Sequence, residues 1–258
     1  MNVLGAIGRF VILIFAEIGR AALFAKDALW IGLSPRYYWT QIAEQLFRVG
    51  YTSLPVVAMT AFFTGGALAL QIYTGSSSTT AATLVPSIVA IGITRELGPV
   101  LAGLMVSGRV GASIAAELGT MRVTEQTDAL VTLSTNPLKY LVGPRLIAAV
   151  VSLPLLVAVG DTIGIMGGYY IGTRALGFNG TAYVKTTADT LHFDDVRSGL
   201  IKAAVFGFII ALMGCYHGFN SKGGAQGVGR ATTNAVVSAA ILILTANFLL
   251  TSLLFGKQ

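Results

Sequence analysis

The sequence predicts an all-α integral membrane protein with N-terminal interfacial helices followed by five transmembrane helices. Of its 258 residues, 54% are hydrophobic and only 11% are charged, whereas a soluble domain carries about 25% charged residues. The 46 residues from Val49 to Thr94 contain no Asp, Glu, Lys or Arg. As a helix this stretch would be about 69 Å long, enough to cross a hydrocarbon core of about 30 Å twice.

The first 48 residues form a separate N-terminal part. Their apolar segments are interrupted by charged residues, among them Arg9, Glu17 and Arg20, too often for a crossing of the bilayer but as expected for a helix that lies in its interface. Aromatic residues at 37–39 would sit at the same level. We therefore predict one or two interfacial helices over residues 1–48 and a five-span domain over residues 49–258.

The spans follow from apolar stretches separated by polar connections. A polar run at 73–80 separates the first two spans, and Asn136-Pro137 marks a turn before the third. The predicted spans are about 50–72, 82–108, 144–171, 201–220 and 231–255.

The connection between spans two and three is predicted to be a helix outside the membrane, over about residues 110–130. It contains five charged residues between Arg109 and Asp128, has no proline, and is rich in Ala, Leu and Glu. Such a composition favours a helix but is too polar for a span.

Positive charges predict the orientation. The chain has 17 Lys and Arg against 11 Asp and Glu, and in a membrane protein such an excess lies in cytoplasmic loops rather than marking a nucleic-acid binder. Twelve of the 17 fall on one side if the N-terminus is cytoplasmic and the C-terminus is outside. The five on the other side are Arg174, Lys185, Arg197, Lys202 and Lys257.

Arg95 and Glu96 are the candidate substrate-binding residues. A charge near the bilayer centre costs roughly 2.5–3.5 kcal/mol, and such residues usually face a cavity or a partner. Pro99 cannot donate to the Arg95 carbonyl, so we expect a kink here, with the freed carbonyl bonded most simply to water in a cavity. The alternative is a structural salt bridge between Arg95 and an acidic residue on another span.

Span three carries Gly160, Gly164, Gly168 and Gly172 at intervals of four residues. This spacing places them on one helix face, and we expect that face to pack closely against another helix. Asp161 lies beside the glycines, and either a position near the outer interface or a role in a cavity fits it equally well.

Other chemistries find little support. The motif G-x-x-x-x-G-K-[ST] is absent, so no P-loop for a nucleotide is expected. His192, His217 and the Asp194-Asp195 pair form no recognisable metal site, and Asp161 lacks the second carboxylate of an aspartyl protease. Cys215 is expected to be a small buried hydrophobic residue.

One long passage, RELGPVLAGLMVSGRVGASIAAELGTMRVTEQTDAL at 95–130, carries a family resemblance, supported by NPLKYLVGPRLIA at 136–148 and GRATT at 229–233. The chain resembles the MlaE family of lipid-transporter permeases, the membrane subunits of ABC systems that work with MCE-domain proteins. The match extends from about residue 40, and residues 173–198 contribute little to it.

The resemblance implies a homodimer in the bacterial inner membrane, with a phospholipid cavity near Arg95 and Glu96. It also implies a cytoplasmic coupling helix that contacts a separate ABC ATPase, which would bind ATP and Mg, and this chain would need no cofactor. An MCE-domain protein would be a further partner, and a small STAS-type regulatory subunit is left open. The expected coupling residues are Glu117, Arg122, Glu125 and Asp128.

Two other functions fit the sequence less well. An ion-coupled secondary transporter would use Arg95, Glu96 and Asp161, but an odd number of spans without a detectable internal repeat argues against it. A membrane scaffold would leave Arg95 and Glu96 without a purpose. The intramembrane arginine, the kink beside it and the charged helix between spans two and three all favour the lipid permease.

Overall fold

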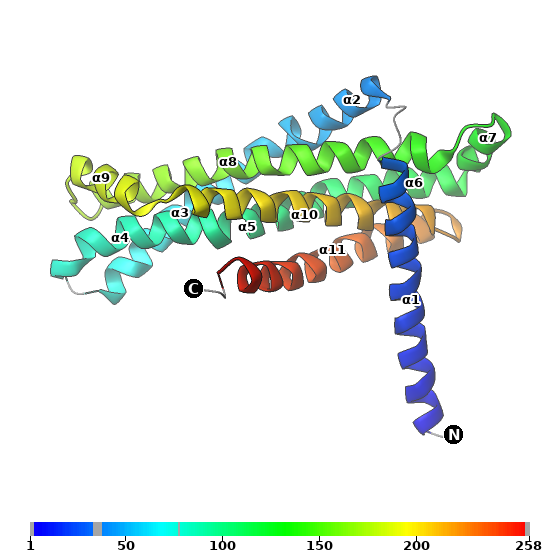
Figure 1. Ribbon diagram of the computed structural model, residues 1–258, viewed down its shortest axis with the longest axis horizontal. Helices are drawn as coiled ribbons and strands as arrows, with labels where there is room; N and C mark the ends of the chain where they lie inside the picture. Colours follow the sequence, from blue (N-terminus) through cyan, green and yellow to red (C-terminus); the bar gives the residue numbers. More distant parts are fainter. Residues whose placement is uncertain (1–2, 33–37, 77, 256–258) are drawn as a thin grey trace.

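The computed structural model describes residues 3–32, 38–76 and 78–255, and within this part of the chain all regular structure is helical. Five helical stretches are long and apolar enough to cross a membrane, and they lie side by side in one elongated bundle (Figure 1). This confirms the predicted all-α class with five spans. Spans one to five are Trp39–Gly75, Thr80–Val123, Leu138–Arg174, Phe193–Phe219 and Gly224–Phe255.

Spans one and two are each built from several helical pieces. Span one comprises α2 (Trp39–Val49), a short 3-10 turn η1 (Tyr51–Ser53) and α3 (Leu54–Gly75). Span two comprises α4 (Ser78–Gly92), α5 (Gly98–Val106) and α6 (Ala112–Val123), joined by the π-helical segments η2 (Ile93–Leu97) and η3 (Ser107–Gly111). A π-helical turn η2 therefore occupies the place where Pro99 predicted a kink.

The remaining spans are more regular. Span three begins with a π-helical turn η4 (Leu138–Val142) and continues as α8 (Gly143–Arg174). The short helix α9 (Gly180–Thr190) leads from it to span four, α10 (Phe193–Phe219), and span five is α11 (Gly224–Phe255). In Figure 1, α9 lies at one end of the bundle, and α7 (Gln126–Thr132) lies at the other.

The N-terminal helix α1 (Val3–Gly32) crosses the α7 end of the bundle instead of running along the spans (Figure 1). Tyr216 of α10 donates a hydrogen bond from Oη to Oε2 of Glu17 at 2.9 Å. Phe24 packs edge-on against the Tyr216 ring, with 5.7 Å between the ring centroids. Phe24 also packs against the ring of Phe219, with 6.2 Å between the ring centroids, so one hydrogen bond and two aromatic contacts join α1 to span four.

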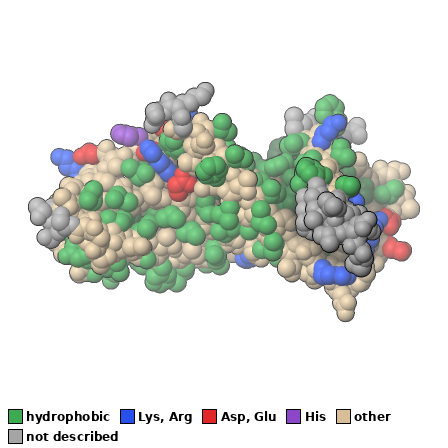
Figure 2. All heavy atoms as spheres, turned by 90° about the horizontal axis from the view of Figure 1, so that it is seen from below, with side chains coloured by type: hydrophobic (Ala, Val, Ile, Leu, Met, Phe, Trp, Pro, Cys, Tyr) green, Lys and Arg blue, Asp and Glu red, His purple; other side chains and the backbone are tan. Residues whose placement is uncertain are grey.

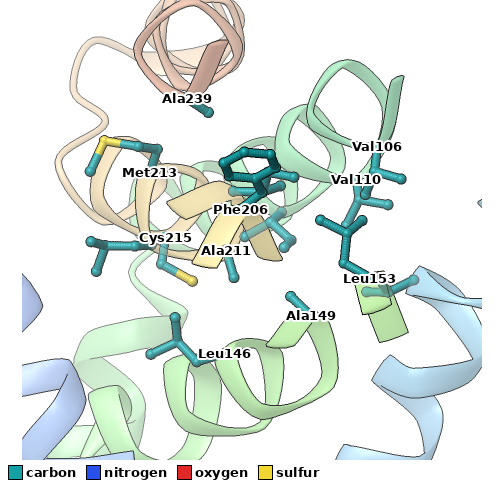
Figure 3. Close-up of a cluster of buried hydrophobic side chains, with 14 of the residues drawn as sticks. Val106, Val110, Leu146, Ala149, Leu153, Phe206, Ala211, Met213, Cys215 and Ala239 are labelled. Atoms are coloured by element: carbon teal, nitrogen blue, oxygen red, sulfur yellow. The ribbon is translucent and has the colours of Figure 1, made fainter. Parts of the chain in front are cut away.

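The core is centred on α10. Its Phe206, Ala211 and Cys215 side chains are fully buried among residues of spans two, three and five (Figure 3). Cys215 is therefore the small buried residue that the sequence predicted. Span five lies at the periphery, with apolar side chains such as Phe248 exposed, and hydrophobic side chains spread along the flank of the bundle in Figure 2.

The structure corrects the predicted bounds. The helix expected at about 110–130 is not a separate element, because span two continues without a break through Arg109 to Val123. Glu125 then adopts a left-handed conformation with φ of 60°, which ends the helix before the short α7. The described helices also extend past most of the predicted span ends, because hydropathy detects the apolar centre of a helix while its backbone hydrogen bonds continue into polar sequence.

The glycines of span three pack against span one of the same chain. A Cβ atom on Gly65 of α3 would lie 1.8 Å from the carbonyl oxygen of Gly164, so the two backbones are in direct contact. Gly160 of α8 lies against Val57 of α3. Further along, Gly168 faces the Tyr183 hydroxyl of α9, at 3.1 Å from its would-be Cβ.

Candidate functional site

Arg95 lies in the π-helical turn η2 and forms an ion pair with Asp195 of α10. Its Nε and Nη2 atoms both lie 2.5 Å from Oδ1 of Asp195. Asp195 is only 1% exposed, and its Oδ2 atom accepts a hydrogen bond from the backbone N–H of His192 at the start of α10. The guanidinium carbon of Arg95 also lies 4.4 Å from the centroid of the Phe255 ring. The acidic partner on another span is therefore present.

Glu96, the next residue, has a different set of partners. Its Oε1 atom accepts hydrogen bonds from Nζ of Lys202 at 2.8 Å and from Oγ1 of Thr251 at 2.9 Å. Its Oε2 atom accepts one from Nδ2 of Asn247 at 2.8 Å. Glu96 thus connects span two to both span four and span five by hydrogen bonds, whereas Arg95 forms its ion pair with span four and contacts span five through the Phe255 ring.

Lys202 completes this cluster and is fully buried. Besides Glu96, its ammonium group donates to the carbonyl oxygen of Arg95 and to Oγ1 of Thr251, each at 2.8 Å. The carbonyl that Pro99 leaves without an intrahelical donor is therefore satisfied by a lysine, which corrects the expectation that water would serve. All three ammonium protons have an acceptor, as burial of a charge requires.

Gly199 lets these groups meet. It lies between Asp195 and Lys202 on one face of α10, and a Cβ atom there would lie 2.3 Å from the carbonyl oxygen of Thr94. The backbone of η2 therefore rests directly on α10. We name the group formed by Arg95, Glu96, Asp195, Lys202 and Asn247 the charged cluster.

Sequence reasoning missed three members of the charged cluster. It counted Lys202 among the positive charges outside the membrane, considered Asp195 only as part of a metal pair, and did not consider Asn247. Asp195, Gly199 and Lys202 are spaced by four and three residues, which places them on one helix face. That pattern, opposite an adjacent Arg-Glu pair, was the signal available in the sequence.

An apolar groove lies on the side of span two that faces spans one and three. It lies between spans one, two and three and has a volume of about 20 Å³, room for about one water molecule. Its walls include Leu97, which follows Glu96 directly, together with Val57, Ala61, Leu101, Met105 and Gly160. Span two thus carries the charged cluster and also lines an apolar groove.

The four predicted coupling residues fall into two groups. Glu117 is held between spans, with its Oε1 atom 2.5 Å from Nη1 of Arg48 and its Oε2 atom 2.8 Å from Nη2 of the buried Arg145. It therefore joins α2, α6 and α8. Arg122 pairs with Asp128 at 2.5 Å across the bend between α6 and α7, and Glu125 is exposed at the bend itself.

The five-span bundle, its buried charged cluster and the adjoining groove define a polytopic helical membrane protein. The chain belongs to the MlaE permease family, because the family model described as Permease MlaE matches residues 42–253. It is accordingly an ABC transporter permease subunit.

Three relatives illustrate the range of the family. The chain is 54% identical to a probable ABC transporter permease protein of Rickettsia typhi, over 99% of this chain and 98% of that protein. It is 31% identical to the intermembrane phospholipid transport system permease protein MlaE of Haemophilus influenzae, with the same coverage. It is 36% identical to the protein TRIGALACTOSYLDIACYLGLYCEROL 1, chloroplastic, of Arabidopsis thaliana, over 86% of this chain and 64% of that protein.

Proposed function

We propose that this permease moves phospholipid between the bacterial inner membrane and an MCE-domain partner, with energy supplied by a separate ATPase that binds ATP and Mg. The name of the Haemophilus influenzae relative supports phospholipid as the substrate. The observation that carries the proposal is that span two contributes both to the charged cluster and to the apolar groove. A phospholipid has the matching parts, a charged headgroup and apolar chains.

Arg95 is the residue that we expect to meet the headgroup phosphate. Its Nε and Nη2 atoms are used by Asp195, but no described residue accepts a hydrogen bond from Nη1. The side chain is 32% exposed, so those N–H groups are within reach of a ligand. Arginine binds phosphate through directed hydrogen bonds, and an aspartate behind it fixes the guanidinium plane.

The assembly that we propose is a homodimer with the N-terminus in the cytoplasm and the C-terminus in the periplasm. The ATPase would then bind at the α6–α7 bend, where Arg122, Glu125 and Asp128 are exposed. The MCE-domain protein would act from the opposite, α9 end. A small STAS-type regulatory subunit is compatible with this arrangement.

The decisive experiment measures phospholipid co-purified per folded permease. Arg95→Ala alone would strand the buried Asp195 carboxylate and lower the folded yield, so it is combined with Asp195→Asn. We expect the double variant to fold and to lose most bound phospholipid, whereas Asp195→Asn alone retains it. Arg95→Lys should retain part of the lipid, because an ammonium group provides charge without the planar fork. Full lipid occupancy in the folded double variant would rule out a headgroup role for Arg95.

The energy source is tested separately in proteoliposomes. We expect lipid transfer only when the ATPase and ATP are both present, with no ATPase activity in the permease alone. Transfer that runs on an ion gradient without ATP would instead support the ion-coupled transporter.

A further inference from the structure

Among the described residues, one buried carboxyl group has no hydrogen-bond or ion-pair partner. Asp161 of span three is only 8% exposed, and no described residue gives it a hydrogen bond or an ion pair. Its Oδ1 atom is completely enclosed. The acidic residues of the charged cluster, Glu96 and Asp195, have multiple partners by contrast.

Gly98 of span two covers this carboxyl group. A Cβ atom on Gly98 would lie 1.8 Å from Oδ1 and 3.0 Å from Cγ of Asp161, so any side chain at this position would displace the carboxyl group. Gly98 is the first residue of α5, directly after η2, and the following Pro99 has no N–H to donate. The cover over Asp161 is therefore backbone without a side chain.

No cation of the described part of the chain pairs with Asp161. The helices α3 and α5, which pack on this part of α8, contain no Asp, Glu, Lys, Arg or His. The segment η2 contributes Arg95 and Glu96, and α10 contributes Asp195 and Lys202, but these four pair with one another. Burying a carboxylate without a partner is strongly unfavourable, and such a group binds a proton instead.

We propose that Asp161 is a proton-binding site whose occupancy is linked to the contact between spans two and three. The acid is neutral while Gly98 covers it, and it ionises when span two moves away and water reaches the carboxyl group. The proton leaves to that water and returns from it, so no net transfer across the membrane is required. By linkage, a higher pH favours the separated arrangement.

Span two has the local structure for such a movement. The π-helical segments η2 and η3 flank α5 on both sides. A π-helical turn shifts the hydrogen-bond register of a helix by one residue and is frequent at functional sites. The segment that carries Gly98 can therefore change position without unfolding the rest of span two.

The protonation state is measured by infrared spectroscopy of the full-length permease. We expect a carbonyl-stretch band of a protonated carboxylic acid near neutral pH, shifted by isotope labelling of aspartate and absent in Asp161→Asn. Asp189→Asn, which removes an exposed carboxylate of α9, should leave the band in place. A wild-type spectrum without this band, or an unchanged band in folded Asp161→Asn, would overturn the proposal. This measurement needs no lipid or ATPase, so its failure is separate from that of the proposed function.

The link to movement is measured by the distance between spin labels at Met105 of α5 and Val159 of α8, both of which are exposed. The labels are introduced as Met105→Cys and Val159→Cys in a Cys215→Ala background. We expect the distance to increase with pH in the otherwise wild-type protein and to stay constant in Asp161→Asn. A distance that ignores pH in both proteins would refute the linkage.

Discussion

Lys202 of span four and Glu96 of span two form an ion pair of 2.8 Å in which the lysine is fully buried. The same ammonium group donates to the Arg95 carbonyl, so one side chain satisfies both a charge and the backbone defect that Pro99 creates. A buried charge with complete hydrogen bonding tolerates the loss of a partner poorly.

Lys202→Met should therefore destabilise the permease by about 3–5 kcal/mol, the usual cost of breaking a buried pair. Adding Glu96→Gln should recover part of this loss, since the stranded carboxylate disappears. Thermal unfolding in detergent measures both effects. Lys185→Met, which removes an exposed charge of α9, is the matched control. Equal stability of Lys202→Met and this control would show that the cluster contributes little to folding.

Gly65→Ala should destabilise the fold because its Cβ atom would meet the Gly164 carbonyl oxygen at 1.8 Å. Backbone atoms have no alternative rotamers, so the helices must separate, at a cost of about 1–3 kcal/mol or more. Gly75→Ala in the same helix meets nothing within 4 Å and should behave like the wild type. Gly164→Leu, with its larger side chain, should disrupt the packing of span three against span one further. Normal unfolding temperatures for both Gly65→Ala and Gly164→Leu would contradict the packing described here.

Glu117→Gln should weaken the ion pairs that connect α2, α6 and α8. Both arginines that it binds lose an anionic partner, and Arg145 is buried, so we expect lower thermal stability before any effect on ATPase binding. Glu44→Gln provides a control, because it removes an exposed partner of the same Arg48. If Glu117→Gln kept full stability but lost ATPase recovery, Glu117 would be a docking residue after all.

Charge reversal at the α6–α7 bend should reduce ATPase binding without reducing the stability of the permease. Glu125→Lys combined with Asp128→Lys changes exposed residues, whose ion pairs contribute about 0–1 kcal/mol, so the permease should still fold. Recovery of the ATPase in a pull-down should fall. Undiminished recovery from a folded double variant would exclude this bend as the docking surface.

The attachment of α1 should weaken in acid. Hydrogen bonds from Tyr216 and Arg20 lower the pKa of Glu17 below its ordinary value of 4.5. A lowered pKa means that the ionised form stabilises the docked helix; this contribution is complete above the ordinary value and is lost as the pH falls through the lowered one. A spin label at the exposed Leu23 should become more mobile over that range. Glu17→Gln should abolish the response, and an identical response in that variant would assign it to another group.

The sequence was sufficient for the class of fold and for the position of Arg95 and Glu96, because hydropathy sums over about 20 residues and tolerates local exceptions. The sequence could not predict which charged residues pair with one another. Asp195 lies 100 residues from Arg95, and Lys202 lies 106 residues from Glu96, and both sit near the predicted start of a span, where a charge reads as part of a loop. Glu117 looked like a surface residue for the same reason, although Arg48, 69 residues earlier, reaches it.

The contact between Gly65 and Gly164 also limits which helices of the subunit can move relative to one another. Two helices that touch through their backbones have no side chains between them to rearrange, so spans one and three move together as one rigid body. Span two contacts span four both through the long polar side chains of the charged cluster and through the backbone contact of Gly199 with Thr94. Span two also contains the π-helical segments η2 and η3, so mechanical work delivered at the α7 end would reach the groove through the wall whose helical register can change locally.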